Sequence, residues 1–297
     1  MQASAECIPC LLRQTLSSAR RVTDDPWLHR KVVFAVMEYL PTINFDRTPA
    51  ELSYDCLRFA NKYLGVVDPF RDDKRGFTEK MLAIENEMRQ DILRAPDPLL
   101  AAIKFALAGN MIDLGIVESE HAEEELARDA ASLELAIDDS EPLRSRLQGA
   151  RSVLYVLDNA GEIVCDKLLV EQLGVRETTC VVRKAPIIND VTREDAEAVG
   201  LGRLAKIVDV GADALGVPLS LCSAEFRQLF ADAGVVIAKG QANFETLDRA
   251  GREVFHILRA KCEQIASYIG VSRGSAVVVR TPREADRAGA QNTEQEI

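Results

Sequence analysis

Short apolar runs alternate with amphipathic helical patterns in the second half of the chain, from about Ser152 onward. The runs have the length of β-strands, and the segments between them carry apolar residues three and four positions apart. This alternation predicts an α/β unit built on a parallel sheet. The predicted strands are Val153–Leu157, Thr178–Val182, Leu204–Val208, Val235–Ala238, Val254–Leu258 and Ala276–Val279, and the predicted helices are Ile163–Leu173, Arg193–Val199 and Ala224–Ala233.

The first half of the chain is predicted to be helical. Apolar residues recur there at helical spacing, and Pro, Gly and Asp residues separate the segments. The stretch from Glu118 to Glu134 is strongly acidic and is expected to form a solvated helix or a mobile lid. The other predicted helices are Cys10–Ala19, Pro26–Tyr39, Ala50–Tyr63, Phe77–Ile92 and Leu99–Ala108.

These two patterns divide the chain into two expected domains. Residues 1–148 are expected to form a helical N-terminal domain, and residues 149–282 are expected to form a mostly parallel α/β domain that carries the candidate site. Residues 283–297 are polar and lack an apolar face, so they are expected to be a disordered tail.

The charge of the chain limits the classes of partner. Its 297 residues carry a formal net charge of −11, which argues against binding to nucleic acid or to an anionic membrane. A small phosphorylated metabolite is still compatible, because it needs only one local cationic pocket. The N-terminus has no signal-peptide pattern, and no apolar run approaches membrane-spanning length, so we expect a cytoplasmic protein.

Polar side chains follow three of the predicted strands at the point where each strand ends. Asp158 and Asn159 follow the first strand, Asp190 comes in the loop after the second, and Lys239 follows Val235–Ala238. The carboxyl ends of parallel strands share one edge of a sheet, where open α/β sheets bind their ligands. Two carboxylates, an amide and a lysine at this edge predict a hard divalent metal beside an anion, for which phosphate is the leading candidate.

Helix capping is the alternative interpretation of these residues. Asp158 would cap the helix that follows it, and Asn189 and Asp190, together with Thr192, would cap the next. Adjacent strand residues also point to opposite faces, so Asp158 and Asn159 can share an ion only if the chain turns there. Ala160-Gly161 supplies the small residues for such a turn.

Basic residues near the same edge are candidates for contact with a substrate phosphate. Arg183 and Lys184 precede Pro186, although an exposed surface pair is the alternative for both. The segment Lys239-Gly240-Gln241-Ala242-Asn243 resembles an anion cradle, in which Gly240 lets the backbone approach and the following helix presents free N–H groups. Lys261 could add a second cation, though a single lysine is more often simply solvated.

The cysteines and histidines do not complete a known catalytic template. Cys7 and Cys10 have the CxxC spacing that suits metal binding, redox exchange or a structural helix start, and no second CxxC or nearby His completes a zinc set. The other five cysteines are expected to be buried and inert. The sequence also lacks a DxDxT phosphatase motif, a GxGxxG fingerprint, a GxxxxGK[ST] loop and a GxSxG elbow.

Six longer motifs stand out along the chain: ECIPCLLRQ at Glu6–Gln14, AGNMID at Ala108–Asp113, LDNAGEIVCDKLL at Leu157–Leu169, RKAPIINDVT at Arg183–Thr192, AKGQANFE at Ala238–Glu245 and RAKCEQIA at Arg259–Ala266. Together these motifs resemble the damage-control phosphatase family, also known as domain of unknown function eighty-nine. The resemblance extends over nearly the whole chain, and the CxxC is typical of the prokaryotic branch. The RTxK motif of the eukaryotic branch is replaced by Arg259-Ala260-Lys261, without the threonine.

The resemblance implies a helical N-terminal domain packed on a Rossmann-like domain, with the active site between them. It implies a divalent metal, Mg²⁺ or Mn²⁺ with Ni²⁺ or Co²⁺ also compatible, and hydrolysis of small phosphometabolites such as sugar phosphates. The implied metal ligands are Asp158, Asn159 and Asp190, and the candidate catalytic residues are Asp158, Asp190 and Lys239. The candidate substrate contacts are Glu162, Arg183, Asn110, Gly240, Gln241, Asn243 and Lys261.

Two other functions compete with phosphatase activity. A phosphometabolite sensor would need the cationic cradle but neither metal nor turnover. A carboxyl methyltransferase, an activity also attached to this family, ranks lower because the chain has no evident glycine-rich methyl-donor loop. Within the phosphatase hypothesis, the nucleophile is either an activated water or Asp158 itself.

Overall fold

The structure is a computed structural model, and it describes residues 1–109 and 122–282. The candidate substrate contact Asn110, the start of the acidic stretch and the predicted tail lie outside the described residues. No helix in the described ranges is both long and apolar enough to cross a membrane.

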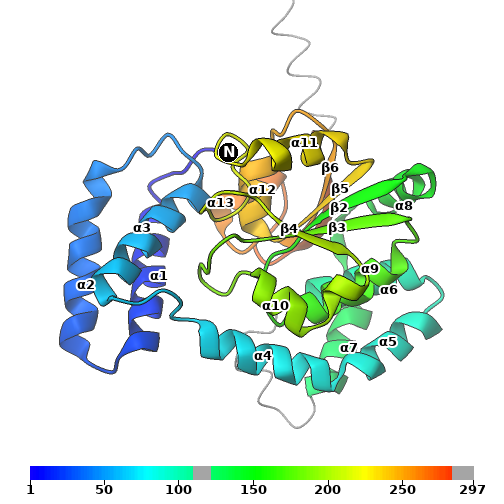
Figure 1. Ribbon diagram of the computed structural model, residues 1–297, viewed down its shortest axis with the longest axis horizontal. Helices are drawn as coiled ribbons and strands as arrows, with labels where there is room; N and C mark the ends of the chain where they lie inside the picture. Colours follow the sequence, from blue (N-terminus) through cyan, green and yellow to red (C-terminus); the bar gives the residue numbers. More distant parts are fainter. Residues whose placement is uncertain (110–121, 283–297) are drawn as a thin grey trace, which may run out of the picture.

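A seven-stranded sheet in the order β1-β7-β6-β5-β2-β3-β4 forms the centre of the molecule (Figure 1). Strands β2 to β6 are mutually parallel, whereas β7 runs antiparallel to β6. The predicted α/β class with a mostly parallel sheet is therefore confirmed. The strands are β1 (Leu135–Asp138), β2 (Ser152–Val156), β3 (Glu177–Val182), β4 (Lys206–Asp209), β5 (Val235–Lys239), β6 (Val254–Arg259) and β7 (Ala276–Thr281).

The order of the strands reverses between β2 and β5. From β2 the chain proceeds outward to β3 and β4, and from β5 it proceeds in the opposite direction to β6. The crossover helices on the two sides therefore diverge, which leaves a crevice at the carboxyl ends of β2 and β5. Asp158 follows β2 and Lys239 ends β5, so both candidate residues come from this switch point.

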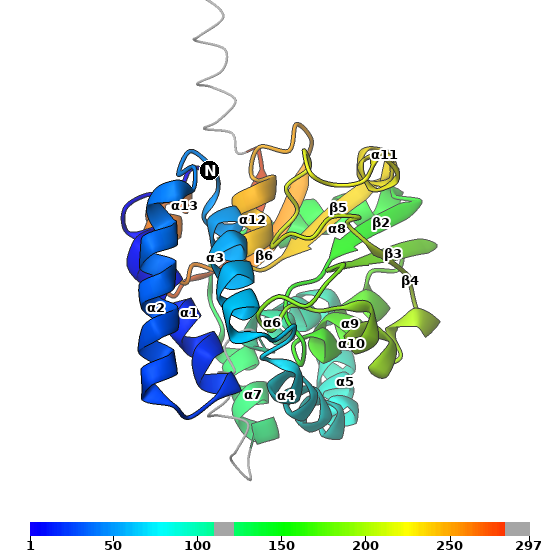
Figure 2. The same ribbon diagram turned by 60° about the vertical axis from the view of Figure 1, so that its left-hand side comes forward.

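The two faces of the sheet are covered by different helices. Val153 and Tyr155 of β2 belong to an apolar core shared with α4–α9, whereas Leu154 and Val156 belong to a second core that includes α11. Figures 1 and 2 show these two helical layers on opposite sides of the strands. The helices are α4 (Arg71–Ala83), α5 (Glu85–Arg94), α6 (Pro98–Gly109), α7 (Ala122–Ser132), α8 (Ser140–Gly149), α9 (Ile163–Gln172), α10 (Arg193–Ala198), α11 (Ala224–Asp232), α12 (Gln241–Leu247) and α13 (Glu263–Ile269).

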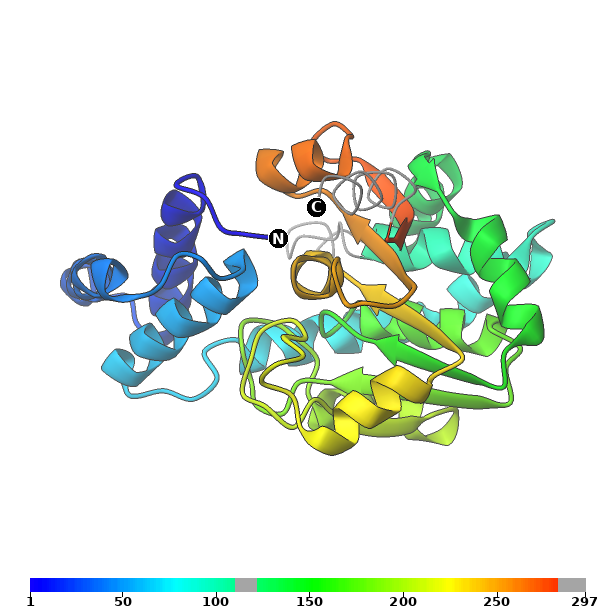
Figure 3. The same ribbon diagram turned by 90° about the horizontal axis from the view of Figure 1, so that it is seen from above.

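Three N-terminal helices, α1 (Cys7–Val22), α2 (Pro26–Tyr39) and α3 (Pro49–Leu64), stand beside the sheet layer (Figure 3). They have an apolar cluster of their own, which includes Leu11, Val36 and Leu52. By contrast, α4–α6 contribute to the core of the sheet, so that core crosses residue 148. The division of the chain at residue 148 stays a prediction.

The predicted elements differ from the observed ones in several respects, and α8 and α13 were not predicted. The predicted helix Phe77–Ile92 is divided at Ile84 into α4 and α5. The edge strand β1 was not predicted, because four residues with alternating burial carry little apolar signal. The last predicted strand, near Ala276–Val279, is present as β7 but runs antiparallel to its neighbour β6. The alternation of apolar runs and helices does not fix strand direction.

Candidate active site

A cavity of about 940 Å³ lies between the N-terminal helices and the carboxyl edge of the sheet. One wall comes from α1 and from the start of α3, and the other comes from the loops after β2, β3, β5 and β6. Five of the predicted site residues line this cavity: Asp158, Asn159, Asp190, Gln241 and Lys261. Glu162, Arg183, Lys239, Gly240 and Asn243 are not among its lining residues.

Backbone hydrogen bonds bring Asp158 and Asp190 together. The loop after β3 folds back, so that Asn159 and Asp190 form an antiparallel β-bridge. The N–H of Val191 donates to the carbonyl of Asp158 at 2.9 Å, and the N–H of Ala160 donates to the carbonyl of Asn189 at 2.8 Å. The main chain therefore turns after β2, as the shared-ion hypothesis requires, and sets the spacing of the two carboxylates.

Both carboxylates are buried and electrostatically strained. Desolvation, the negative charge of Asp190 and that of Glu162 raise the pKa of Asp158 to about 7. Burial also raises the pKa of Asp190, although the guanidinium of Arg183 opposes the shift. The ammonium of Lys261 lowers the pKa of both, but it does not cancel the excess of negative charge. A cation placed between the two carboxylates would relieve this strain.

The side chains of Asp158, Asn159 and Asp190 offer the oxygen donors that a hard divalent ion prefers. Asp158 and Asp190 provide carboxylate oxygens, and the side chain of Asn159 provides an amide. The Nδ2 of Asn159 donates to Asp158 at 2.8 Å and to Glu162 at 3.1 Å, which leaves its amide oxygen for a further ligand. Within residues 1–109 and 122–282, no three His, Cys, Asp or Glu side chains are arranged to hold a metal. A three-ligand site at this edge therefore needs the oxygen of Asn159.

Position 240 has room only for glycine, because its backbone packs closely against Asp158. Its φ is +79°, in the left-handed region, and a Cβ built at this position would lie 1.9 Å from Oδ2 of Asp158. The predicted close backbone approach at Gly240 is therefore present, but it is made to a protein carboxylate. A substrate contact of Gly240 stays a prediction.

Arg183 lies behind Asp190, away from the cavity. It is 1% exposed, and its Nε donates to Oδ2 of Asp190 at 2.6 Å. Its two Nη atoms donate to the carbonyl of Gly216 and to Oδ1 of Asn243. Asn243 in turn donates to the carbonyls of Leu157 and Lys239, at the ends of β2 and β5. Arg183 and Asn243 thus brace the switch point and orient Asp190.

Lys239 is the centre of a second buried network. Its Nζ donates to Glu162 at 2.5 Å, to Asp166 at 2.6 Å and to the carbonyl of Ala106 at 3.2 Å. Burial alone would lower the pKa of Lys239, but the two carboxylates hold that pKa above its ordinary value. The hydroxyl of Tyr155 donates to Asp166 at 2.7 Å. Lys239 therefore fixes Glu162, which in turn accepts the hydrogen bond from Asn159.

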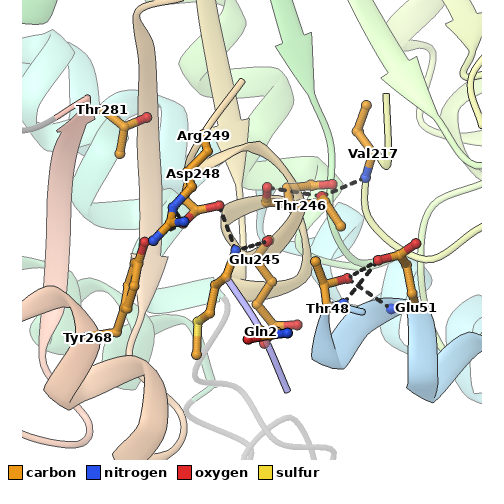
Figure 4. Close-up of polar contacts among 12 residues, drawn as sticks. Gln2, Thr48, Glu51, Val217, Glu245, Thr246, Asp248, Arg249, Tyr268 and Thr281 are labelled. Atoms are coloured by element: carbon orange, nitrogen blue, oxygen red, sulfur yellow. Dashed lines mark hydrogen bonds and ion pairs between the residues drawn. The ribbon is translucent and has the colours of Figure 1, made fainter. Parts of the chain in front are cut away.

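The cavity also contains a carboxyl group that the sequence did not single out. Glu245 lines the wall and is 5% exposed, and burial raises its pKa to about 7. Gln241 donates to its carboxylate at 2.9 Å, and the N–H of Ala50 adds a hydrogen bond from the start of α3. Figure 4 shows Glu245 on α12, together with the Thr48–Glu51 capping box that begins α3. Glu245 lies inside the AKGQANFE motif, and its helical position gave no sign of a role at the cavity.

A strained residue in the loop after β3 also lines the cavity. Ile188 has a φ of +46°, which is rare for a β-branched residue. It precedes Asn189 and Asp190, so the unusual conformation belongs to the turn that presents Asp190. Neither the spacing nor the composition of the sequence indicates this strain.

The CxxC cysteines line the same cavity. Both are free thiols, and Cys7 donates to Oε1 of Gln264 at 2.9 Å. Burial raises the pKa of Cys7, which disfavours its thiolate form. The role of the CxxC pair stays a prediction.

The chain is similar to known proteins over most of its length. The family model described as the damage-control phosphatase ARMT1-like domain matches residues 3–277. A damage-control phosphatase of Pyrococcus horikoshii is 33% identical over 285 residues, which cover 94% of this chain and 98% of that protein. A damage-control phosphatase of Archaeoglobus fulgidus is 32% identical over 287 residues, covering 93% and 98% of the two chains.

The fold also matches a solved structure. The crystal structure of a DUF89 family protein from Pyrococcus horikoshii superposes with a TM-score of 0.88 at 32% sequence identity. The match covers 94% of this chain and 99% of that one.

The Lys239 network generates a prediction about stability. Replacing Lys239 with Met leaves two buried carboxylates without their cation, so the free energy of unfolding should fall by about 3–5 kcal/mol. Urea denaturation followed by circular dichroism measures this change. The triple variant K239M/E162Q/D166N should recover much of the loss, because no charge is then left unpaired. A K239M variant as stable as the wild type would contradict the proposed network.

Glu245 generates a prediction about pH. Its pKa is raised on folding, so its contribution to stability is complete below its unfolded pKa and is lost as the pH rises through about 7. Glu245→Gln should therefore be more stable than the wild type near pH 8.5, by up to about 3 kcal/mol, and nearly equal to it near pH 5. Urea unfolding at both pH values, with chelator present, tests this. Glu79→Gln, an exposed change on α4, is the control and should show no such dependence.

Proposed function

This chain belongs to the family of the damage-control phosphatase ARMT1-like domain, and on that premise we propose that it is a metal-dependent phosphatase of small phosphometabolites such as sugar phosphates. The observation that carries the proposal is the pair of buried carboxylates, Asp158 and Asp190, side by side on the wall of a large cavity. Buried like charges of this kind are typical of sites that bind a cation or perform acid–base chemistry.

The dimensions of the cavity favour a small-molecule substrate. A volume of about 940 Å³ is within the range of pockets that enclose small ligands. The wall combines polar side chains at the sheet edge with apolar ones such as Leu11 and Leu215. A phosphorylated sugar would fill such a space, with its phosphoryl group at the sheet edge and its carbon skeleton toward α1.

Asp158, Asn159 and Asp190 are the residues that would hold the metal. Mg²⁺ or Mn²⁺ matches their oxygen donors, and Co²⁺ or Ni²⁺ is also compatible. When bound, such an ion supplies neutralisation of phosphoryl charge and activation of a nucleophile.

The remaining residues bind and orient the substrate. Lys261 lines the cavity close enough to Asp158 and Asp190 to lower the pKa of both, so its ammonium can pair with a phosphoryl oxygen. Gln241 accepts the backbone N–H of Lys261 at 3.0 Å and thereby fixes that segment. Glu245 is protonated below about pH 7 and can donate its proton to the oxygen of the leaving group. The nucleophile is a water molecule or Asp158.

Substitution of the carboxylates tests the proposal. Asp190→Asn should lower metal-dependent hydrolysis of an aryl phosphate by roughly 100-fold or more, because it removes a charged ligand from the electrostatic site. Calorimetry should show weaker binding of Mn²⁺ by the same variant, which is a readout independent of turnover. Asp72→Asn changes an exposed acid on α4 and should leave both properties unchanged.

A panel of sugar and nucleotide phosphates, assayed with Mg²⁺, Mn²⁺, Co²⁺ and Ni²⁺, should identify the preferred substrate class. Full activity of Asp190→Asn would remove the proposed site. Binding of phosphometabolites without turnover, with or without chelator, would favour the sensor instead. Binding of a sulfonium methyl donor would favour the methyltransferase.

A further inference from the structure

Helix α2 exposes an apolar stripe on its outer face. Trp27, Phe34 and Met37 are 63%, 54% and 48% exposed, whereas Val32 and Val36 on the inner face are fully buried against α1 and α3. Figures 1 and 2 show α2 at the outer edge of the molecule, away from the sheet. Three large apolar side chains on one exposed helical face are typical of a surface that binds another protein.

Two charged side chains beside this stripe have no oppositely charged partner within the helix. Lys31 and Glu38 are both exposed on α2. They lie seven residues apart, about 10 Å along the axis, which is too far for an ion pair. No residue three or four positions from either one carries the opposite charge. Arg30 differs, because its guanidinium stacks on the ring of Trp27 at 4.0 Å.

A two-fold axis at Phe34 would pair these charges. At about 100° per residue, Lys31 and Glu38 lie on the same side of Phe34, roughly 60° and 40° around the helix. Lys31 precedes Phe34 by three residues and Glu38 follows it by four, so antiparallel packing of two copies sets Lys31 within about 2 Å, along the axis, of the partner's Glu38.

The same two-fold axis also brings the apolar residues into contact. It places Phe34 against its own copy. On the flank of Phe34 opposite to Lys31, it places Arg30 against the partner's Met37. The stripe is thus complementary to itself in both charge and apolar character.

We propose that α2 is a homodimer interface, in which two copies of this chain pack antiparallel about Phe34. The balance of charges favours a second copy over a membrane surface, because anionic lipid would select for cations alone on the polar flank. One helix face buries a small area, so the dimer should be reversible, with a dissociation constant on the order of micromolar. The interface lies outside the cavity and does not depend on the proposed function.

Charge reversal with rescue tests the register. Lys31→Glu and Glu38→Lys should each place like charges together and shift the protein to monomer in sedimentation velocity experiments. The double variant K31E/E38K restores opposite charges and should recover the dimer. Recovery by the double variant is a readout that general damage to α2 would not give. If the wild type sediments as a monomer at every accessible concentration, the proposal is wrong.

Trp27 and Phe34 provide two independent readouts. Trp27 is the single tryptophan of the chain, so dilution of the dimer should shift its emission to longer wavelength as the ring becomes hydrated. Phe34→Cys should be cross-linked to its own copy by a short bis-maleimide, because the two-fold axis passes beside it. Leu221→Cys, also exposed and apolar but on the loop before α11, is the control and should not cross-link. Equal cross-linking of the two variants would overturn the two-fold arrangement.

Discussion

The enforced proximity of two buried carboxylates, Asp158 and Asp190, is the constraint on which the rest of the site depends. Desolvation and mutual repulsion both oppose the charged forms, and they raise the pKa of Asp158 to about 7. No attraction between the side chains could hold this pair, so the backbone holds it. The bridge between Asn159 and Asp190 ties the loops after β2 and β3 together, and the folding energy of the whole sheet supports that bridge.

Around this pair the polar residues form two layers with different tasks. Asn159, Gln241 and Lys261 face the cavity and can meet a ligand. Behind them, Arg183 and Lys239 are almost completely buried; Arg183 pairs with one carboxylate, and Lys239 pairs with two. Buried ion pairs add little net stability, but they fix the positions of the groups they join. The second layer therefore holds the first in place, as precise electrostatic sites require.

The N-terminal helices complete the site and also present a second surface. The inner side of α1 and the start of α3 close the cavity, and the backbone of Ala50 bonds directly to Glu245. The outer face of α2 carries Trp27 and Phe34 on the opposite side of the same small bundle. No residue of α2 lines the cavity, so a dimer formed through the outer face of α2 would not occupy it.

The sequence by itself determined the α/β class and the polar residues at the strand ends. Apolar runs of strand length ending in Asp158 or Lys239 carry that information, because burial and periodicity are local properties of a chain. The long motifs also indicated the family, which the comparisons confirmed. Local pattern could not distinguish the residues that face the cavity from those that brace it, since Arg183 and Lys239 look like exposed cations in sequence.

Only the tertiary structure decided that distinction. Arg183 meets Asp190 because the loop after β3 folds back, and Lys239 meets Glu162 and Asp166 because β5 lies beside β2. Burial in the folded protein raises the pKa of Glu245, and its carboxylate meets the N–H of Ala50 because α12 packs against α3, a helix far away in the chain. Burial and charge pairing depend on which side chains the fold brings together, and the local pattern of the sequence does not show which residues will meet.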